Sequence, residues 1–200
     1  MKTLIAIPAM SWVYTGFLQS MLELDKPDAN MAIQQNSMIF DARNNLAWGA
    51  MQNGYDRVLW LDSDMRFGAD LLTRLNADMD EHGLDYVSAW FTGRKTGAKA
   101  CVYKSIEWDA GQGKVTAKAE PFEKRMEGLF ETAGSGFGAV LMKTDVLREV
   151  GKAFGPPFIP LPYMGEDISF CWRAGQLGIK MWCDGSIRVG HIGPQVFGED

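Results

Sequence analysis

The feature that most constrains this chain is a short, mostly apolar run from Arg57 to Leu61 (RVLWL) that leads directly into Asp62-Ser63-Asp64. A continuous run of this kind is typical of a strand in the middle of a parallel sheet, where both faces are covered. The acidic triplet then lies at the carboxyl end of that strand. Open α/β sheets bind their ligands at this edge, so the triplet is predicted to lie at a binding site.

Short apolar runs alternate with helical patterns along the first half of the chain, as in βαβ units. We expect strands at residues 2–7, 30–35, 57–61 and 85–91, and helices at 11–24, 41–53 and 69–79. Ser11 and Asp41 are placed to cap the first two of these helices. The predicted fold class is α/β, with a mixed, mainly parallel sheet and helices on both faces.

The second half begins with a stretch of different character, residues 92–127, in which β-like runs are joined by Gly-containing turns. It predicts a small antiparallel excursion from the sheet. A strand at about 139–143, a helix at 144–150 and a Pro-rich loop up to Gly165 are expected to follow. This loop is too short for an interdomain linker, so we expect one domain over residues 1–200.

Composition excludes several classes of protein. A chain of 200 residues with 46% hydrophobic content can form a sizeable core, and a net charge of −5 argues against a broadly basic, nucleic-acid-binding surface. Three cysteines without a CxxC pair indicate buried thiols in a reducing compartment. Pro8 interrupts the amino-terminal apolar run, and no run reaches the roughly 20 residues that span a bilayer. We therefore expect no transmembrane segment and a cytoplasmic location.

Asp62 and Asp64 are two residues apart, so their carboxylates can lie on one face of an extended chain or converge on a cation where the chain turns. Hard oxygen ligands of this kind suit Mg²⁺ or Mn²⁺ bridged to a diphosphate. An Asx-turn that leads into the next helix explains the same residues without a metal. The triplet alone leaves both interpretations open.

Three further segments place the triplet in a pattern: Ala42-Arg43-Asn44 upstream, and ETAGSGFGAVLMKTDVL and MGEDISFCWRAGQLGIKMWCD downstream. In order and spacing the chain resembles the GT-A glycosyltransferases, in particular the large family 2-like group of bacterial and phage sugar transferases. The resemblance covers most of the chain, and residues 92–127 match least. It implies a GT-A-like, Rossmann-type sheet, with residues 1–91 as the nucleotide-binding half and 92–200 as the acceptor half that completes the metal site.

The activity that this resemblance implies is transfer of a hexosyl group from a UDP- or GDP-sugar to an acceptor hydroxyl. Inversion is preferred, and retention stays open. The implied site residues are Asp62, Asp64 and His191 for Mn²⁺ or Mg²⁺, Pro8, Arg43, Asp62 and Ser63 for the donor, and Asp167 as the general base with Glu166 as the alternate that contacts the acceptor.

Several of these residues also have structural explanations. Acidic residues such as Glu166 and Asp167 are favoured in the first turn of any helix by the macrodipole. Arg43 could bind phosphate, brace the nucleotide loop or pair with a surface carboxylate. A lone histidine such as His191 is more often structural than a ligand, although a neutral imidazole binds Mn²⁺ readily.

Other groups of residues are less specific. Gly134, Gly136 and Gly138 lack the spacing of a phosphate loop and indicate close approach of the backbone to a sugar. Arg94, Lys95 and Lys99 are expected to form a solvated turn, with binding of the donor phosphates or of an anionic acceptor as the alternative. His82 is expected at a helix end. The four residues Trp90, Trp108, Trp172 and Trp182 could stack on sugar rings but are expected mainly in the core.

Two other functions stay open. One is a GT-A-like domain that binds a glycan or nucleotide sugar without turnover. The other is a sugar nucleotidyltransferase, although PAMSWVYTG lacks the basic, Gly-rich signature expected after the first strand. The acceptor is unidentified and could be a glycan, a lipid, a protein or a modified base. Its site could be shallow, formed by residues 92–127, or completed by a second subunit in a homo-oligomer.

Overall fold

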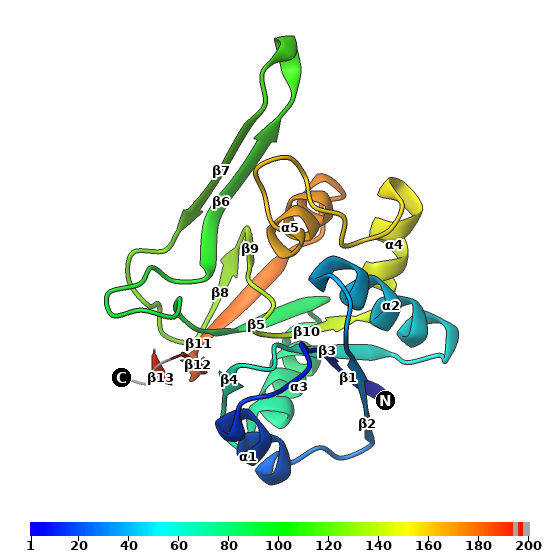
Figure 1. Cartoon of the computed structure of the whole chain (residues 1–200), viewed down its shortest axis with the longest axis vertical. Helices are drawn as coiled ribbons and strands as arrows, with labels where there is room; N and C mark the ends of the chain where they lie inside the picture. Colours follow the sequence, from blue (N-terminus) through cyan, green and yellow to red (C-terminus); the bar gives the residue numbers. More distant parts are fainter. Residues whose placement is uncertain (194–195, 198–200) are drawn as a thin grey trace.

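The molecule is built on a seven-stranded mixed sheet. The computed structural model describes residues 1–193 and 196–197. In spatial order the strands are β2 (Ala29–Gln34), β1 (Thr3–Pro8), β3 (Arg57–Leu61), β10 (Ala139–Lys143), β5 (Tyr86–Trp90), β11 (Met181–Arg188) and β8 (Leu129–Thr132) (Figure 1). All of them except β10 and β8 run in the same direction. The mixed, mainly parallel sheet predicted from the sequence is confirmed.

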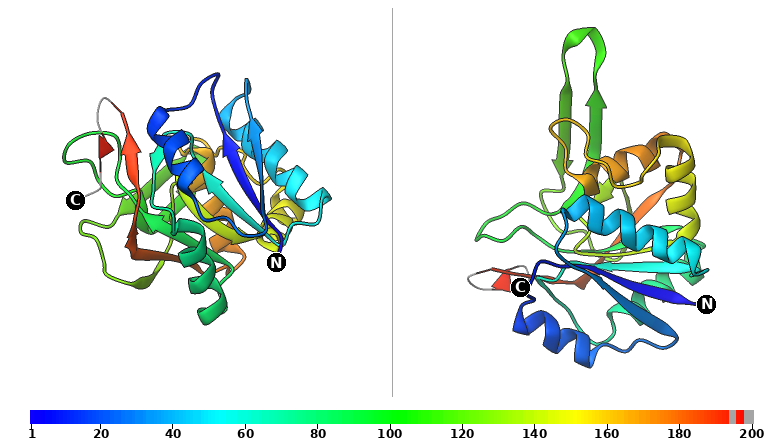
Figure 2. Two further views of the ribbon diagram at one scale, coloured as in Figure 1. Left: turned by 90° about the horizontal axis from the view of Figure 1, so that it is seen from below. Right: turned by 45° about the vertical axis from the view of Figure 1, so that its right-hand side comes forward.

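Helices cover both faces of this sheet (Figure 2). They are α1 (Thr15–Glu23), α2 (Ile39–Gln52), α3 (Leu71–His82), α4 (Thr144–Phe154) and α5 (Glu166–Gln176). Successive side chains of a strand point to opposite faces. Leu59 and Leu61 of β3 accordingly pack with α1 and α3, whereas Val58 and Trp60 pack with α2, α4 and α5. Every residue of β3 is buried, as expected for a central strand.

Two three-stranded sheets extend the core. One is formed by β13 (Val196–Phe197), β12 (Gly190–Ile192) and β4 (Met65–Arg66), and the other by β7 (Thr116–Pro121), β6 (Val102–Asp109) and β9 (Gly134–Ser135). The first sheet joins the end of the chain to the segment directly after the acidic triplet, because β12 pairs with β4. This pairing has direct consequences for the site described below.

The hairpin of β6 and β7 projects from the body of the molecule as a two-stranded arm (Figures 1 and 2). A short 3₁₀ turn at Gly111–Gly113 lies between its strands. The arm confirms the antiparallel excursion expected within residues 92–127. Trp108 holds it against the body: its indole Nε1 donates to Pro162 O at 3.2 Å, and its ring meets Trp172 edge-on, with the ring centroids 5.3 Å apart.

The helix starts expected from capping residues are wrong at two places. Tyr14 precedes α1 and Met38 precedes α2, and neither makes a side-chain cap hydrogen bond. The Ser11 hydroxyl donates to Asn36 Oδ1 at 3.2 Å, so it is engaged elsewhere. Asp41 lies inside the first turn of α2, where the macrodipole favours an acidic residue. Among the described residues, no helix is both long enough and apolar enough to cross a membrane.

Candidate active site

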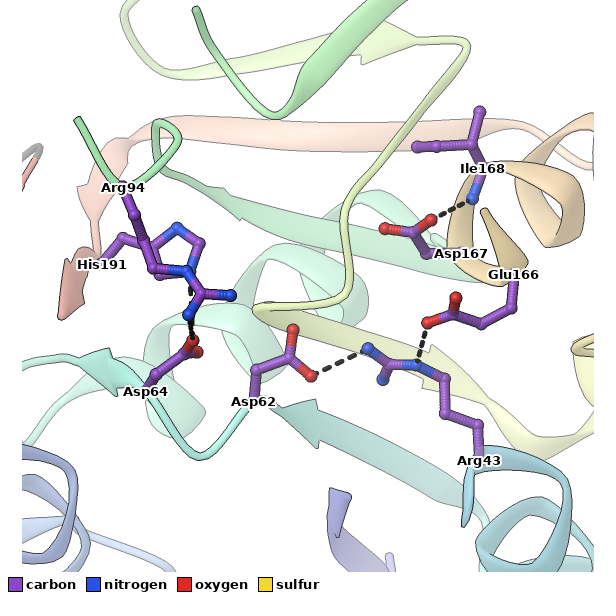
Figure 3. A network of polar contacts seen from close by, with 8 residues as sticks. All are labelled: Arg43, Asp62, Asp64, Arg94, Glu166, Asp167, Ile168 and His191. Carbon is purple, nitrogen blue, oxygen red and sulfur yellow. Dashed lines mark hydrogen bonds and ion pairs between the residues drawn. The ribbon is translucent and has the colours of Figure 1, made fainter. Parts of the chain in front are cut away.

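The acidic triplet lies at the carboxyl end of β3, as the sequence predicts. The Asp62 N–H donates to Gly138 O of the segment before β10 at 3.3 Å, and the Met65 N–H donates to Asp62 O at 3.2 Å. The second of these bonds closes a turn, so the chain reverses across Ser63 and Asp64 before β4 begins. The two carboxylates are therefore separated by a turn and face different neighbours (Figure 3).

The pairing of β12 with β4 brings His191 to Asp64. His191 lies opposite Met65 in this pair, and the Ile192 N–H donates to Asp64 O at 2.7 Å. As a result, His191 Nε2 lies 3.4 Å from Asp64 Oδ2. Two residues far apart in the sequence thus meet at the edge of the sheet, as the resemblance implies.

The orientation of His191 is fixed by a second contact, between Nδ1 and Thr92 O at 3.0 Å. A carbonyl oxygen can only accept, so Nδ1 carries a proton. In the neutral ring Nε2 would then present a lone pair towards a carboxylate oxygen of Asp64, whereas in the protonated ring it donates to that oxygen. A cation between these two acceptors would stabilise the neutral arrangement, and a metal-bound imidazole usually donates its other N–H to a backbone carbonyl, as His191 does to Thr92 O.

Asp64 also fits a cation in other respects. Its Oδ1 atom is buried without a hydrogen-bond partner, which leaves a ligand oxygen unsatisfied. Burial acts to raise the pKa of Asp64, but the hydrogen bond and charge of His191, together with Arg94, outweigh it and lower the pKa. The carboxylate is therefore ionised at neutral pH, as metal ligation requires.

Asp62 has a different partner. Its Oδ1 atom accepts from Arg43 Nη2 at 2.8 Å, and its other oxygen points away from Arg43 (Figure 3). Within residues 1–193 and 196–197, no three His, Cys, Asp or Glu side chains converge as a ready set of metal ligands. The structure thus brings Asp64 and His191 together and directs one oxygen of Asp62 to the guanidinium instead.

Arg43 of α2 joins the two acidic elements of the site. Its Nε donates to Glu166 Oε1 at 3.1 Å, so that one guanidinium holds both Asp62 and Glu166. The Arg43 side chain is only 2% exposed and lies over the rings of Trp60 and Phe137. Pairing with a surface carboxylate, one of the roles considered above, is therefore wrong, because Arg43 is a buried link between α2, β3 and α5.

Burial and charge act against each other at Asp62. Burial raises its pKa, Arg43 acts in the opposite direction, and the neighbouring Asp64 adds to the increase, so the pKa is raised overall. Arg43 is fully charged because its acidic neighbours outweigh the effect of burial. The guanidinium is thus the group that allows several carboxylates to lie close together here.

Asp167 lies in the first turn of α5, beside Glu166, at the helix start expected from the sequence. Its Oδ1 atom accepts from the Ile168 N–H at 2.7 Å. Burial, and then the charge of Glu166, raise the pKa of Asp167 to about 6 despite the opposing effect of Arg43. A carboxylate with this pKa is ionised at neutral pH and is a stronger base than an exposed aspartate.

A cavity of about 280 Å³ connects these groups. Its walls come from the segment after β1, the start of α2, the acidic triplet and the start of α5. The site residues predicted from the sequence that line it are Pro8, Arg43, Asp62, Ser63, Asp64, Glu166 and Asp167. Met10, which lies in the same loop as Pro8, also lines it. Trp12 and Tyr14 line it as well, and sequence reasoning missed these two. The rings of Trp12 and Tyr14 meet edge-on at 5.1 Å, and a pair of aromatic residues just after a predicted first strand was the available signal.

Arg94 enters the same cavity from the loop after β5. Its Nη1 atom lies 3.0 Å from Asp64 Oδ2, so it is not simply part of a solvated turn. Lys95 and Lys99 of the same loop are exposed and lie outside this cavity. The sequence cluster of three basic residues thus divides into one that reaches the site and two that do not.

The glycine series lies where the backbone approaches other groups closely, and the nearest of these are side chains of the protein. A Cβ atom at Gly134 would overlap Cys171 of α5, and one at Gly138 would lie 2.8 Å from Met65 Cε. A Cβ at Gly136 would lie 3.5 Å from Asp167 Oδ2. These glycines therefore permit α5 and β4 to pack against the segment that precedes β10.

The cysteines do not provide a nucleophile. Cys101, Cys171 and Cys183 are free thiols, and burial raises the pKa of each to about 12. A thiol that stays protonated at neutral pH is a poor nucleophile. The charged groups that line the cavity are accordingly carboxylates and two guanidinium groups, and the imidazole of His191 lies behind Asp64, outside this lining. His82 lies at the end of α3, before Gly83 in the left-handed conformation, as expected for a residue outside the site.

Comparison with solved structures identifies the fold. No protein-family model and no curated protein matches the sequence. The chain is similar to A197 from STIV, with a TM-score of 0.68 and 21% identity over 96% of this chain and 86% of that one. It is also similar to GalNAc-T7, in a crystal structure with UDP, GalNAc and Mn²⁺, with a TM-score of 0.64 and 13% identity over 96% of this chain.

A third likeness is to residues 1–349 of TarS from S. aureus, with a TM-score of 0.55 and 16% identity over 92% of this chain. This chain spans 44% of the GalNAc-T7 chain and 58% of the TarS chain, so it corresponds to a part of each. These likenesses confirm the GT-A fold that the sequence predicts.

Proposed function

We propose that this chain is a glycosyltransferase that moves a sugar from a nucleoside-diphosphate sugar to an acceptor hydroxyl, with inversion at the anomeric carbon. One observation carries the proposal. Asp64, with His191 beside it, and Asp167 lie at the same carboxyl edge of the sheet, so a pair that suits a cation and a carboxylate that suits a base are close together. The glycosyltransferase-like fold supports it. So does the GalNAc-T7 structure, which contains UDP, GalNAc and Mn²⁺.

Asp64 and His191 are the residues that would hold Mn²⁺ or Mg²⁺. A carboxylate oxygen and a neutral imidazole nitrogen suit Mn²⁺ in particular. The ion would supply positive charge to the departing diphosphate. With these two protein ligands, the ion would take its other ligands from the diphosphate and from water.

Asp167 would act as the general base. Its Oδ1 atom is held by the Ile168 N–H, which leaves Oδ2 to accept the proton of the acceptor hydroxyl. As that O–H bond breaks, the oxygen forms a bond to the anomeric carbon, and the bond from this carbon to the diphosphate oxygen breaks. The pKa of about 6 keeps Asp167 ionised and basic at neutral pH.

Arg43 and Glu166 would position these groups. The guanidinium fixes Glu166 at the start of α5, one residue before the base, and fixes Asp62 one residue before the turn of the triplet. Glu166 lines the cavity and is placed to accept a hydrogen bond from the acceptor. A rigid arrangement of this kind holds the base near its working position before substrate binds.

The two halves of the chain contribute different walls of this cavity, and we assign a different part of the substrates to each. Pro8, Ser63 and the aromatic residues Trp12 and Tyr14 belong to the first 91 residues, and we assign this wall to the nucleotide. Glu166 and Asp167 belong to residues 92–200, and we assign their side to the sugar and the acceptor. The Trp108 contact places the arm beside the loop before α5, so the arm borders the acceptor side.

A panel of UDP- and GDP-sugars, each with and without Mn²⁺, tests the proposal through thermal stabilisation and donor hydrolysis. We expect at least one donor to stabilise the protein only when Mn²⁺ is present. Asp64→Ala and His191→Ala should abolish this stabilisation, whereas Asp167→Asn should keep it and lose turnover. His82→Ala, at the exposed end of α3, is the matched histidine control. The proposal fails if no donor binds, or if the Asp64 and His191 variants bind donor and Mn²⁺ as the unaltered protein does.

A further inference from the structure

Arg94 occupies a position that bears directly on cation binding. Its Nη1 atom lies 3.0 Å from Asp64 Oδ2, which is the same oxygen that His191 Nε2 approaches to 3.4 Å. Figure 3 shows both side chains directed at Asp64 from one side of the constellation. The guanidinium is thus a positive charge held directly against Asp64.

The two partners differ in how firmly they are held. The Asp64 side chain is 13% exposed, whereas that of Arg94 is 54% exposed. A long side chain with a half-exposed guanidinium can adopt other rotamers at small cost. A surface ion pair of this kind contributes little to stability, so it is easily exchanged for another partner.

The backbone beneath Arg94 is fixed, so the exchange needs only its side chain. Thr92 and Ala100 form a bridge, the Gly93 N–H donates to Lys99 O at 3.2 Å, and the Ala98 N–H donates to Lys95 O at 3.0 Å. The same hairpin presents Thr92 O to His191 Nδ1. Arg94 can therefore leave Asp64 while His191 keeps its orientation.

We propose that Arg94 is an exchangeable counterion: it neutralises Asp64 in the free protein and moves to the diphosphate of the donor when a divalent cation binds Asp64. A guanidinium and a divalent cation repel each other, so they do not share one carboxylate oxygen favourably. Arg94 lines the cavity assigned to the donor, and a guanidinium binds phosphate oxygens through two parallel hydrogen bonds. This inference rests on the proposed function.

The exchange has a distinctive consequence, because Arg94 opposes one binding event and assists another. Without its guanidinium, a divalent ion has no cation to displace, so the free protein should bind Mn²⁺ more tightly. The same change removes a charged contact to the diphosphate, so nucleoside diphosphate should bind more weakly when Mn²⁺ is present. If Arg94 only braced the loop, its replacement would weaken the binding of Mn²⁺ and of diphosphate alike, or would change neither.

The experiment measures two affinities in Arg94→Gln, in Arg94→Lys and in Lys95→Gln, the control with the same charge change in the same loop. Titration calorimetry gives the affinity for MnCl₂ alone, and then for UDP and GDP at saturating Mn²⁺. For Arg94→Gln we expect Mn²⁺ affinity to rise about two- to fivefold, the size of an exposed ion pair. We expect affinity for the preferred diphosphate to fall about tenfold, the size of a charged hydrogen bond.

Arg94→Lys should keep Mn²⁺ affinity near that of the unaltered protein, because the positive charge remains. It should lose part of the diphosphate affinity, because an ammonium group cannot form the two parallel hydrogen bonds of a guanidinium. The inference is overturned if Arg94→Gln binds Mn²⁺ no more tightly than Lys95→Gln, or if it binds diphosphate equally well. If the unaltered protein binds Mn²⁺ and a diphosphate but Arg94→Gln behaves as Lys95→Gln, this inference alone fails. If the unaltered protein binds neither, the proposed function fails with it.

Discussion

Arg43 Nη2 lies 2.8 Å from Asp62 Oδ1, so the first carboxylate of the acidic triplet is bonded to a buried guanidinium of α2. The same guanidinium holds Glu166. One side chain thus joins the end of β3 to the start of α5, and the position of Asp167 depends on it.

Arg43→Met is expected to lower the free energy of unfolding by about 3 kcal/mol, because it leaves Asp62 and Glu166 partly buried without their partner. The value is at the low end for a buried pair because the Asp62 side chain is 30% exposed and can regain water. Urea unfolding measures the change. Arg148→Met, which removes an exposed pair with Asp145, should cost less than about 1 kcal/mol.

A rescue distinguishes charge from packing at this position. Adding Asp62→Asn and Glu166→Gln to Arg43→Met removes the uncompensated charges and should restore part of the lost stability. If Arg43→Met is no more harmful than Arg148→Met, Arg43 is not the link described here.

The rate of transfer should rise with pH through about 6 and then level off. Asp167 accepts a proton only when ionised, and burial, followed by the charge of Glu166, raises its pKa to about 6. The pH profile of kcat/KM measures this. Asp167→Asn should lower kcat/KM by about a hundredfold or more and remove the acidic limb. Asp145→Asn, an exposed acid on α4, should leave the profile unchanged, and an acidic limb that survives in Asp167→Asn would assign the base elsewhere.

The same pKa predicts that Asp167→Asn is more stable than the unaltered protein at pH 7.5. Folding raises the pKa of Asp167 from 3.8 to about 6, so its protonated form contributes stability. This contribution is complete below pH 3.8 and is lost as the pH rises through about 6. Ionised Asp167 therefore costs stability at neutral pH, on the order of 1–2 kcal/mol after allowance for its partial exposure. Thermal unfolding at pH 7.5 and pH 4 should show the gain of Asp167→Asn at the higher pH and little of it at the lower.

Gly134→Ala should destabilise the protein by about 1–3 kcal/mol, since its Cβ would overlap Cys171 at a backbone φ of +148°. Gly175→Ala, in α5 itself, is the matched control because its Cβ would meet nothing within 4 Å. That variant should be more stable by about 0.5–1 kcal/mol, as for alanine in a helix. Chemical unfolding of the two variants compares them; equal effects would show that the Gly134 contact is not restrictive.

The sequence predicted well what depends on local pattern. Arg57–Leu61 is β3 as expected, because a continuous apolar run has few alternatives to a central strand. Glu166 and Asp167 begin α5 as expected, because the loop before them breaks the helix pattern. Helix starts were predicted poorly where the residues before α1 and α2, Tyr14 and Met38, carry no capping side chain to recognise.

The partners within the site depend on tertiary structure, which the sequence does not display directly. The approach of His191 to Asp64 was expected from the resemblance, and its cause is the pairing of β12 with β4. The choice of Asp62 and Glu166 as partners of Arg43 depends on how α2 packs against β1, β2 and α4. The approach of Arg94 to Asp64 depends on the hairpin after β5, whose basic residues have the same sequence pattern as a solvated turn.

The pairing of β12 with β4 also sets the order in which the site can form as the polypeptide is made. Arg43, Asp62 and Asp64 leave the ribosome early, Glu166 and Asp167 later, and His191 after all of them. Asp167 and Arg43 are therefore made while Asp64 still lacks its imidazole neighbour. Of the contacts described in the site, the approach of His191 to Asp64 is therefore the last to form.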